Sequence, residues 1–106
     1  MSEALVVLGW SGCPSTLIVH DWVADVCAEA GIQPPPLELE YIETDADAVA
    51  RGFIGSPTVV RDGIDLFPEP GAPPGLTCRL YRRRDGRPSP LPDPDDFVDA
   101  LRASGR

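Results

Sequence analysis

The junction at residues 10–16, Trp-Ser-Gly-Cys-Pro-Ser-Thr, constrains the fold most, because a strand meets a helix there. The apolar run before it, residues 4–8, is typical of a strand covered on both faces. Pro14 suits the first helical position because its missing N–H needs no partner, so Cys13 is predicted to be the N-cap. The helix dipole there favours an anion, and the thiolate is the reactive form of cysteine. Ser15 and Thr16 can add hydroxyl donors, whereas the alternative role for Cys13 is a small buried residue.

From residue 14 to about residue 30, apolar residues recur at three- and four-residue steps, which predicts an amphipathic helix ended by Gly31. The apolar positions are Ile18, Val19, Trp22, Val23, Val26, Cys27 and Ala30. Cys27 is expected in the core, about 21 Å along the helix from Cys13 at a rise of ~1.5 Å per residue. Residues 37–43 alternate apolar and acidic side chains, which predicts a half-exposed strand. Strand, helix and strand form a right-handed βαβ unit with parallel strands.

The rest of the chain predicts shorter elements. Thr44 can cap a helix over residues 45–51, and the Asp62-Gly63 pair predicts a hairpin between residues 58–61 and 64–67. A strand is expected over residues 76–81 after a proline-rich loop. A closing helix is expected with Asp93 as its cap and Pro94 in its first position. Residues 1–106 are therefore expected to form a single α/β domain with a mixed four- or five-stranded sheet and helices on both faces.

Charge and cysteine usage exclude several classes of function. The net charge of −8 argues against nucleic acid and anionic membranes as partners. No apolar stretch approaches a membrane span and no signal peptide precedes the domain, so a cytoplasmic location is expected. Three irregularly spaced cysteines argue against a disulfide framework. Five arginines lie between residues 79 and 87; we interpret them as a solvated strand and turn, with a patch for an anion or acidic partner as the alternative.

The order of these elements, the Trp10–Pro14 turn and the stretch Gly55-Ser56-Pro57-Thr58-Val59 together resemble the thioredoxin superfamily over nearly the whole chain. The first strand ends where the first helix begins, and an antiparallel third strand starts at that same end, which places Pro57 beside Cys13. The resemblance implies a cis Pro57 and a thioredoxin-like fold. It also implies that Trp10, Pro14, Ser56 and Pro57 contact the substrate, with the Ser56 backbone binding an extended thiol substrate.

The chain departs from the family pattern at Thr16, which stands where Cys-x-x-Cys has its second cysteine. Thr16 could hydrogen-bond to the Cys13 thiolate, as hydroxyls at that place do in monothiol relatives. Cys78 could replace the missing thiol, because the hairpin returns the chain to the sheet end that carries Cys13. The alternative role for Cys78 is a buried strand residue. With Cys78, the pattern looks like a group of small bacterial thioredoxin-like proteins, some labelled alkylmercury-lyase-like.

Three functions remain open from the sequence. The first is a thiol enzyme in which Cys13 attacks a disulfide, Thr16 assists and Cys78 resolves the mixed disulfide; its partner is a protein or small-molecule thiol or disulfide. The second is a site for a soft metal such as mercury or copper, held by both thiols. The third is a redox-inactive adaptor that presents the Ser56-Pro57 groove and the arginines to a protein. No phosphate loop, hydrolytic triad or histidine-carboxylate metal cluster is present in the sequence, and no cofactor is expected.

Overall fold

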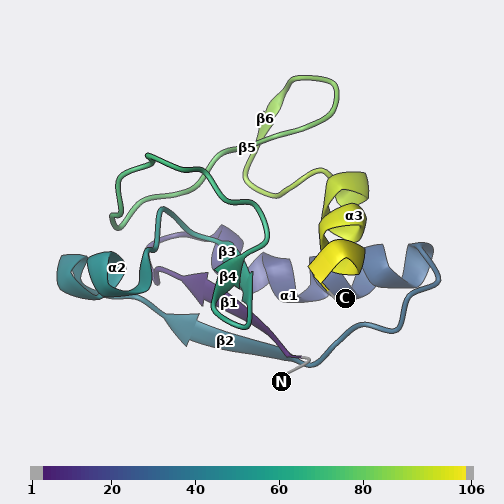
Figure 1. Ribbon diagram of the computed structural model, residues 1–106, viewed down its shortest axis with the longest axis horizontal. Helices are drawn as coiled ribbons and strands as arrows, with labels where there is room; N and C mark the ends of the chain where they lie inside the picture. The colour runs from purple at the N-terminus through teal and green to yellow at the C-terminus, as the bar shows by residue number, and fades with distance from the viewer. Residues whose placement is uncertain (1–3, 105–106) are drawn as a thin grey trace.

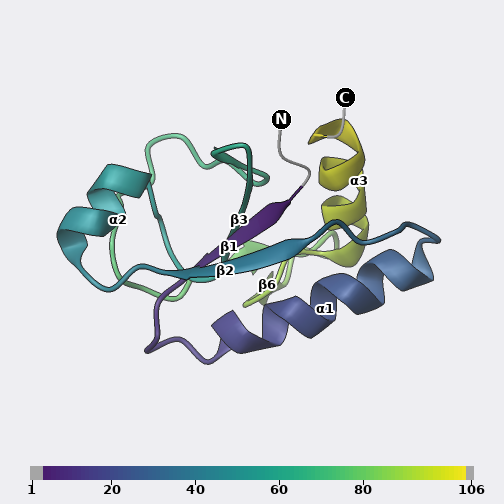
Figure 2. The same cartoon turned by 90° about the horizontal axis from the view of Figure 1, so that it is seen from below.

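The computed structural model describes residues 4–104, which form an α/β structure with a mixed sheet. In chain order the elements are β1 (Leu5–Gly9), α1 (Ser15–Glu29), β2 (Leu37–Tyr41), α2 (Asp45–Arg51), β3 (Thr58–Arg61), β4 (Ile64–Asp65), β5 (Tyr81–Arg82), β6 (Pro88–Ser89) and α3 (Pro94–Ser104). Helix α1 runs beneath the sheet, and α2 and α3 lie towards opposite ends of the molecule (Figures 1 and 2).

The main sheet has four strands in the order β2-β1-β3-β4. β1 is parallel to β2, with Leu5 opposite Leu37, and antiparallel to β3, with Leu8 opposite Thr58. The predicted βαβ unit, mixed sheet and interior first strand are therefore confirmed. The Leu8–Thr58 register is the one that matters for the site, because it brings the end of β1 and the start of β3 to the same end of the sheet.

Apolar residues pack against both faces of this sheet in two clusters. On one face, alternate residues of β1 and β3 contact α1 and α3; the buried members are Leu5, Val7, Val19, Val23, Val26, Cys27, Val59, Phe97, Val98 and Leu101. On the other face lie Leu8, Ile42, Ala48, Phe53 and Val60, with Ala48 contributed by α2. The change of face between Val59 and Val60 follows from the two-residue period of a strand. Both faces of the interior strands are therefore covered.

Several predicted boundaries and orientations need correction. Ile18 was predicted on the apolar face of the first helix, but it is 56% exposed. The strand predicted to end at Phe67 ends at Asp65, because the Asp65 carboxylate accepts a hydrogen bond from the Phe67 N–H (2.8 Å) and turns the chain. The strand predicted over 76–81 is not part of the main sheet. β4 occupies the edge of β3, so the backbone of this segment forms an isolated bridge to Ser56, ahead of β3, and its last residue, Tyr81, pairs with β6.

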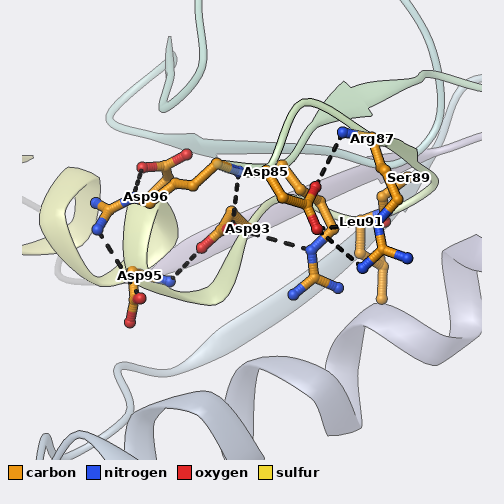
Figure 3. Close-up of polar contacts among 9 residues, drawn as sticks. Asp85, Arg87, Ser89, Leu91, Asp93, Asp95 and Asp96 are labelled. Carbon is orange, nitrogen blue, oxygen red and sulfur yellow. Dashed lines mark hydrogen bonds and ion pairs between the residues drawn. The ribbon is translucent and has the colours of Figure 1, made fainter.

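The predicted caps of the second and third helices, Thr44 and Asp93, are confirmed. Thr44 Oγ1 accepts the N–H of Asp47 (3.1 Å) at the start of α2. Asp93 accepts the N–H of Asp95 (3.0 Å) at the start of α3, as Figure 3 shows. In the β5–β6 turn beside it, Asp85 accepts from the guanidinium of Arg87 (2.9 Å). No helix among residues 4–104 is long and apolar enough to cross a bilayer.

The arginine-rich stretch is not one solvated surface, which corrects the sequence interpretation. Arg79 is buried, with 4% of its surface exposed. Arg84 is exposed but bonds to the carboxylates of Asp96 (2.7 Å) and Asp99 (2.8 Å) on α3. Both guanidinium groups are thus committed to carboxylates within the chain, so neither is free to bind an anion or an acidic partner.

Candidate thiol site

Cys13 lies in the loop between β1 and α1, at the end of the sheet where β3 begins. Its N–H donates to the Trp10 carbonyl (2.9 Å), which closes a tight turn, and its carbonyl accepts from Thr16 N–H (3.3 Å). The predicted N-cap position is wrong by one residue. Pro14 is the cap, with helical φ −66° and ψ −21°, and α1 begins at Ser15. Cys13 is only 3% exposed, so its thiol is largely shielded from solvent.

The Ser56-Pro57 loop faces Cys13 because the antiparallel pairing of β1 and β3 ends there. The Cys13 thiol lies 3.5 Å from the Ser56 carbonyl oxygen, to which it donates when protonated. The Ser56–Pro57 peptide bond is cis, and both residues are buried. The sequence argument from strand direction therefore placed these two loops correctly.

A third segment, residues 77–79, completes the site. Ser56 N–H donates to the Thr77 carbonyl (2.8 Å), and Ser56 carbonyl accepts from Arg79 N–H (2.8 Å). These two bonds form an isolated parallel bridge that sets Cys78 opposite Ser56. The Cys78 thiol is 3.1 Å from the Cys13 sulfur, to which it donates a hydrogen bond. Cys78 is exposed, unlike the buried strand residue of the alternative interpretation.

The backbone of Ser56 is therefore not free for an extended substrate in this structure. Both of its polar groups are satisfied by residues 77–79, and Ser56 itself is fully buried. Of the other residues predicted to contact a substrate, Trp10 is half-buried and Pro14 is exposed. A substrate strand could reach Ser56 only by displacing the segment that carries Cys78.

Arg79 anchors this segment from inside the protein. Its guanidinium bonds to the carboxylates of Asp65 (2.9 Å) and Glu69 (3.2 Å) and to the Phe67 carbonyl. It also lies 4.6 Å from the centre of the Tyr81 ring, a cation–π contact. A planar, five-donor guanidinium satisfies these partners at once, as an ammonium could not. Arg79 thereby fixes the residue next to Cys78.

Tyr81 ties the same segment to the proline loop. Its hydroxyl donates to the Pro57 carbonyl, and burial raises the pKa of the phenol. Gly55 allows the close approach of the two loops, because a Cβ there would lie 2.9 Å from the Arg79 Cβ. Its φ of +144° is also unfavourable for any residue with a side chain. These contacts hold residues 55–57 and 77–81 against each other.

Thr16 belongs to the site, but it bonds to other groups than the predicted one. Its hydroxyl lies 2.6 Å from the Ser56 hydroxyl and donates to the Trp10 carbonyl (3.2 Å). Gly9 permits this packing, since a Cβ at that position would overlap the Thr16 methyl group. Thr16 thus positions the loops on either side of Cys13.

The hydrogen bonds around Cys13 stabilise its thiolate. Burial raises the pKa of Cys13, but the hydrogen bond from the Cys78 thiol lowers it. Hydrogen bonds with Ser15 and Ser56 lower it further. The resulting pKa lies below the ordinary value of 9.0. The pKa of Cys78 is raised, chiefly by the bond to Cys13 and then by burial and by the charge of Cys13. In the ionised pair, Cys13 is therefore the thiolate and Cys78 holds the proton.

Sequence reasoning missed the anchoring residues. The sequence interpretation placed Arg79 in a solvated strand and Tyr81 at the end of a short strand, and only their alternation with Cys78 and Leu80 could have indicated that they point inward. Leu80 is in fact 68% exposed, and Arg79 and Tyr81 are buried on either side of it. A buried arginine is recognised from its carboxylate partners. Here these are Asp65, at the end of β4, and Glu69, in the loop after it, and no short-range pattern in the sequence links them to Arg79.

No cluster of three or more histidine, cysteine, aspartate or glutamate side chains within residues 4–104 is placed to hold a metal ion. The site is thus a pair of thiols with hydroxyl and backbone neighbours. In comparisons with known proteins, the chain matches no protein-family model, no curated protein and no solved structure.

Proposed function

We propose that the protein is a thioredoxin-like protein in which Cys13 and Cys78 form a redox pair for thiol–disulfide exchange. The strand order β2-β1-β3-β4, with β2 parallel and β3 antiparallel to β1, supports the fold assignment. The position of Cys13, between β1 and the long helix α1, supports it further. Cys78 supplies the second thiol that Cys-x-x-Cys provides in dithiol members of that superfamily.

The observation that carries the proposal is the 3.1 Å separation of the Cys13 and Cys78 sulfurs. A disulfide bond is about 2.05 Å long, so the two atoms need to approach by only about 1 Å. Forming this bond removes two electrons and two protons from the two thiols. A substrate disulfide takes them up and is cleaved to two thiols, and the reverse reaction oxidises two substrate thiols.

The same geometry favours redox exchange over the two alternatives. Two thiolates holding one ion in a line at about 2.3 Å each would stand about 4.6 Å apart, so the two sulfurs would have to separate by about 1.5 Å from their present 3.1 Å. An adaptor that presents the Ser56-Pro57 groove would need that backbone free, but Thr77 and Arg79 already bond to it. The redox pair requires neither rearrangement.

The test is a titration of the reduced protein with mixtures of reduced and oxidised glutathione, followed by alkylation and mass analysis. We expect a monomer that has lost two hydrogens and keeps one alkylatable thiol, Cys27, after unfolding. The control variant Cys27→Ala should form the same internal disulfide and keep no alkylatable thiol. Glutathione adducts or intermolecular dimers in place of the internal bond would contradict the redox pair. Protection of both thiols by Hg²⁺ or Cu⁺ without internal oxidation would favour the metal site.

A further inference from the structure

The two sulfurs of the pair differ sharply in access to solvent. Cys13 is 3% exposed and lies beneath the Ser56-Pro57 loop, whereas Cys78 is exposed on the edge of the site. Exchange between thiols and disulfides requires the attacking sulfur to approach the attacked one closely. A substrate coming from solvent therefore meets Cys78 first.

We propose that Cys78, and not Cys13, is the sulfur that bonds to the substrate, and that Cys13 is the buried partner that leaves and resolves. This inference rests on the proposed redox pair and assigns which of its sulfurs reacts with the substrate and which resolves the mixed disulfide. It reverses the roles that the sequence indicated, where Cys13 was the attacking thiol and Cys78 the resolving one. The substrate is a thiol or disulfide that approaches the exposed edge at Cys78 without pairing with the Ser56 backbone.

The chemistry balances in the oxidising direction as follows. A substrate thiolate attacks the Cys78 sulfur of the internal disulfide, forming a mixed disulfide on Cys78 and expelling Cys13 as a thiolate. A second substrate thiolate then attacks the substrate sulfur of the mixed disulfide and expels Cys78, which takes up a proton. The two substrate thiols leave as a disulfide, and the protein holds the two electrons. Cys78 carries no S–H at this point, so the contacts that favour the departing Cys13 thiolate are those of Ser15 and Ser56.

In the reducing direction the same contacts work in reverse. The Cys78 thiol donates to Cys13 across 3.1 Å, so Cys13 can accept its proton as Cys78 attacks a substrate disulfide. The first substrate thiolate leaves and takes that proton from Cys13. Cys13 then attacks the Cys78 sulfur, closing the internal disulfide and releasing the second substrate thiolate. The substrate disulfide is thus the oxidant, and no other co-reactant is needed.

Residues 77–79 explain why the substrate does not reach Cys13 directly. They occupy the Ser56 backbone through two bonds of 2.8 Å, and Arg79 anchors them in the interior. The chain thus places its own cysteine opposite Cys13, where the resemblance to thioredoxins had indicated a substrate.

The test compares two single-thiol variants in a Cys27→Ala background, Cys13→Ser and Cys78→Ser, reacting with oxidised glutathione near pH 9.0, the ordinary cysteine pKa. Each rate is divided by the thiolate fraction of that variant, measured from its thiolate absorbance, so that the corrected rates report access. We expect the Cys13→Ser variant, which retains Cys78, to form its adduct about tenfold faster or more. Equal rates, or faster reaction at Cys13, would overturn the assignment.

A second measurement needs no cysteine substitution and so avoids any folding defect. Oxidised wild-type protein is mixed with reduced glutathione, quenched with acid, and the adduct is mapped by mass spectrometry. Glutathione on Cys78 supports the assignment, and glutathione on Cys13 overturns it while leaving the redox pair intact. Failure of the wild type to form any internal disulfide contradicts the redox pair itself, and the assignment falls with it.

Discussion

Cys13 and Cys27 stand at opposite ends of α1, and both are buried, yet their surroundings have opposite effects on their thiols. Cys27 is fully buried among apolar side chains of α1 and the sheet, and burial raises its pKa. Cys13 is 3% exposed, but its pKa is lowered, since the hydrogen bonds from neighbouring groups outweigh burial. Burial alone therefore does not decide whether a cysteine is inert. The polar groups within reach of the sulfur decide it.

The largest effect on stability is expected from replacing Arg79, which anchors the segment that carries Cys78 beside Cys13. Arg79→Leu leaves the carboxylates of Asp65 and Glu69 without their buried partner, and we expect a loss of about 2–3 kcal/mol in the free energy of unfolding, because both carboxylates are partly exposed. Internal disulfide formation should weaken with it, since residues 77–79 lose their anchor. Denaturant unfolding and the glutathione titration measure the two effects. Arg79→Lys is the matched control, which keeps the charge but not the planar donors, and an unchanged Arg79→Leu would contradict the anchoring role.

The apolar surroundings of Cys27 are tested by placing a hydroxyl group at that position. Cys27→Ser places a hydroxyl in a fully buried apolar site, and we expect a loss of about 1–3 kcal/mol in unfolding free energy. Cys13→Ser, made among hydroxyl and carbonyl groups, should cost less. Denaturant melts of both variants test this ordering. If Cys13→Ser is the more destabilising, the two environments do not differ as described.

Thr16 offers a smaller test of the polar side. Thr16→Val removes the bonds to the Ser56 hydroxyl and the Trp10 carbonyl while keeping the shape, so we expect a loss of about 1 kcal/mol. Thr16→Ser keeps the hydroxyl and should retain most of the stability. Thermal or denaturant melts compare the two. A Thr16→Val protein as stable as Thr16→Ser would show that these bonds do not hold the loops.

The smallest effect is expected on the pKa values of the thiols, which compare the surroundings of Cys13 and Cys27 directly. In wild type, thiolate absorbance at Cys13 should develop below pH 9.0, and that at Cys27 above it. Cys78→Ala removes the thiol that donates to Cys13, so the pKa of Cys13 should rise. Thiolate absorbance against pH in Cys27→Ala and in the double variant with Cys78→Ala measures this shift. An unmoved Cys13 transition would contradict the role of the Cys78 hydrogen bond.

The same shifts give opposite contributions to stability. Cys13 ionises more readily in the folded protein, so its contribution grows as pH rises towards 9.0 and is lost as pH falls through the folded pKa. Cys27 ionises more readily in the unfolded chain, so it lowers stability as pH rises above 9.0. Cys27→Ala should therefore lose less stability than wild type above that pH. An equal loss in both proteins would contradict this assignment.

Local patterns were sufficient to predict the elements around the site. The apolar run before Gly9, the period of α1, the Thr44 cap and the Asp62-Gly63 turn all act within a few residues, and the structure has each of them. Strand direction then placed the Ser56 loop beside Cys13. These steps need only short-range chemistry and the topology of a mixed sheet.

The path of residues 76–81 could not be predicted in the same way. It depends on the pairing of β4 with β3, which excludes this segment from the main sheet, and on the ion pairs of Arg79 with Asp65 and Glu69. Both are contacts between residues far apart in the sequence. The burial of Cys13 and the exposure of Cys78 follow from that path. Sequence reasoning therefore brought the two thiols to the same sheet end but could not determine which of them faces solvent.

The bridge between Ser56 and Cys78 has a consequence for chain association. By holding the Cys78 sulfur 3.1 Å from that of Cys13, it gives each thiol a far higher effective concentration for the other than any dissolved thiol can reach. If the proposed pair closes, we therefore expect a higher protein concentration to do little to promote covalent dimers, because closure within one chain should be faster. Releasing the bridge would remove this protection and make cross-linking through the exposed Cys78 depend on concentration.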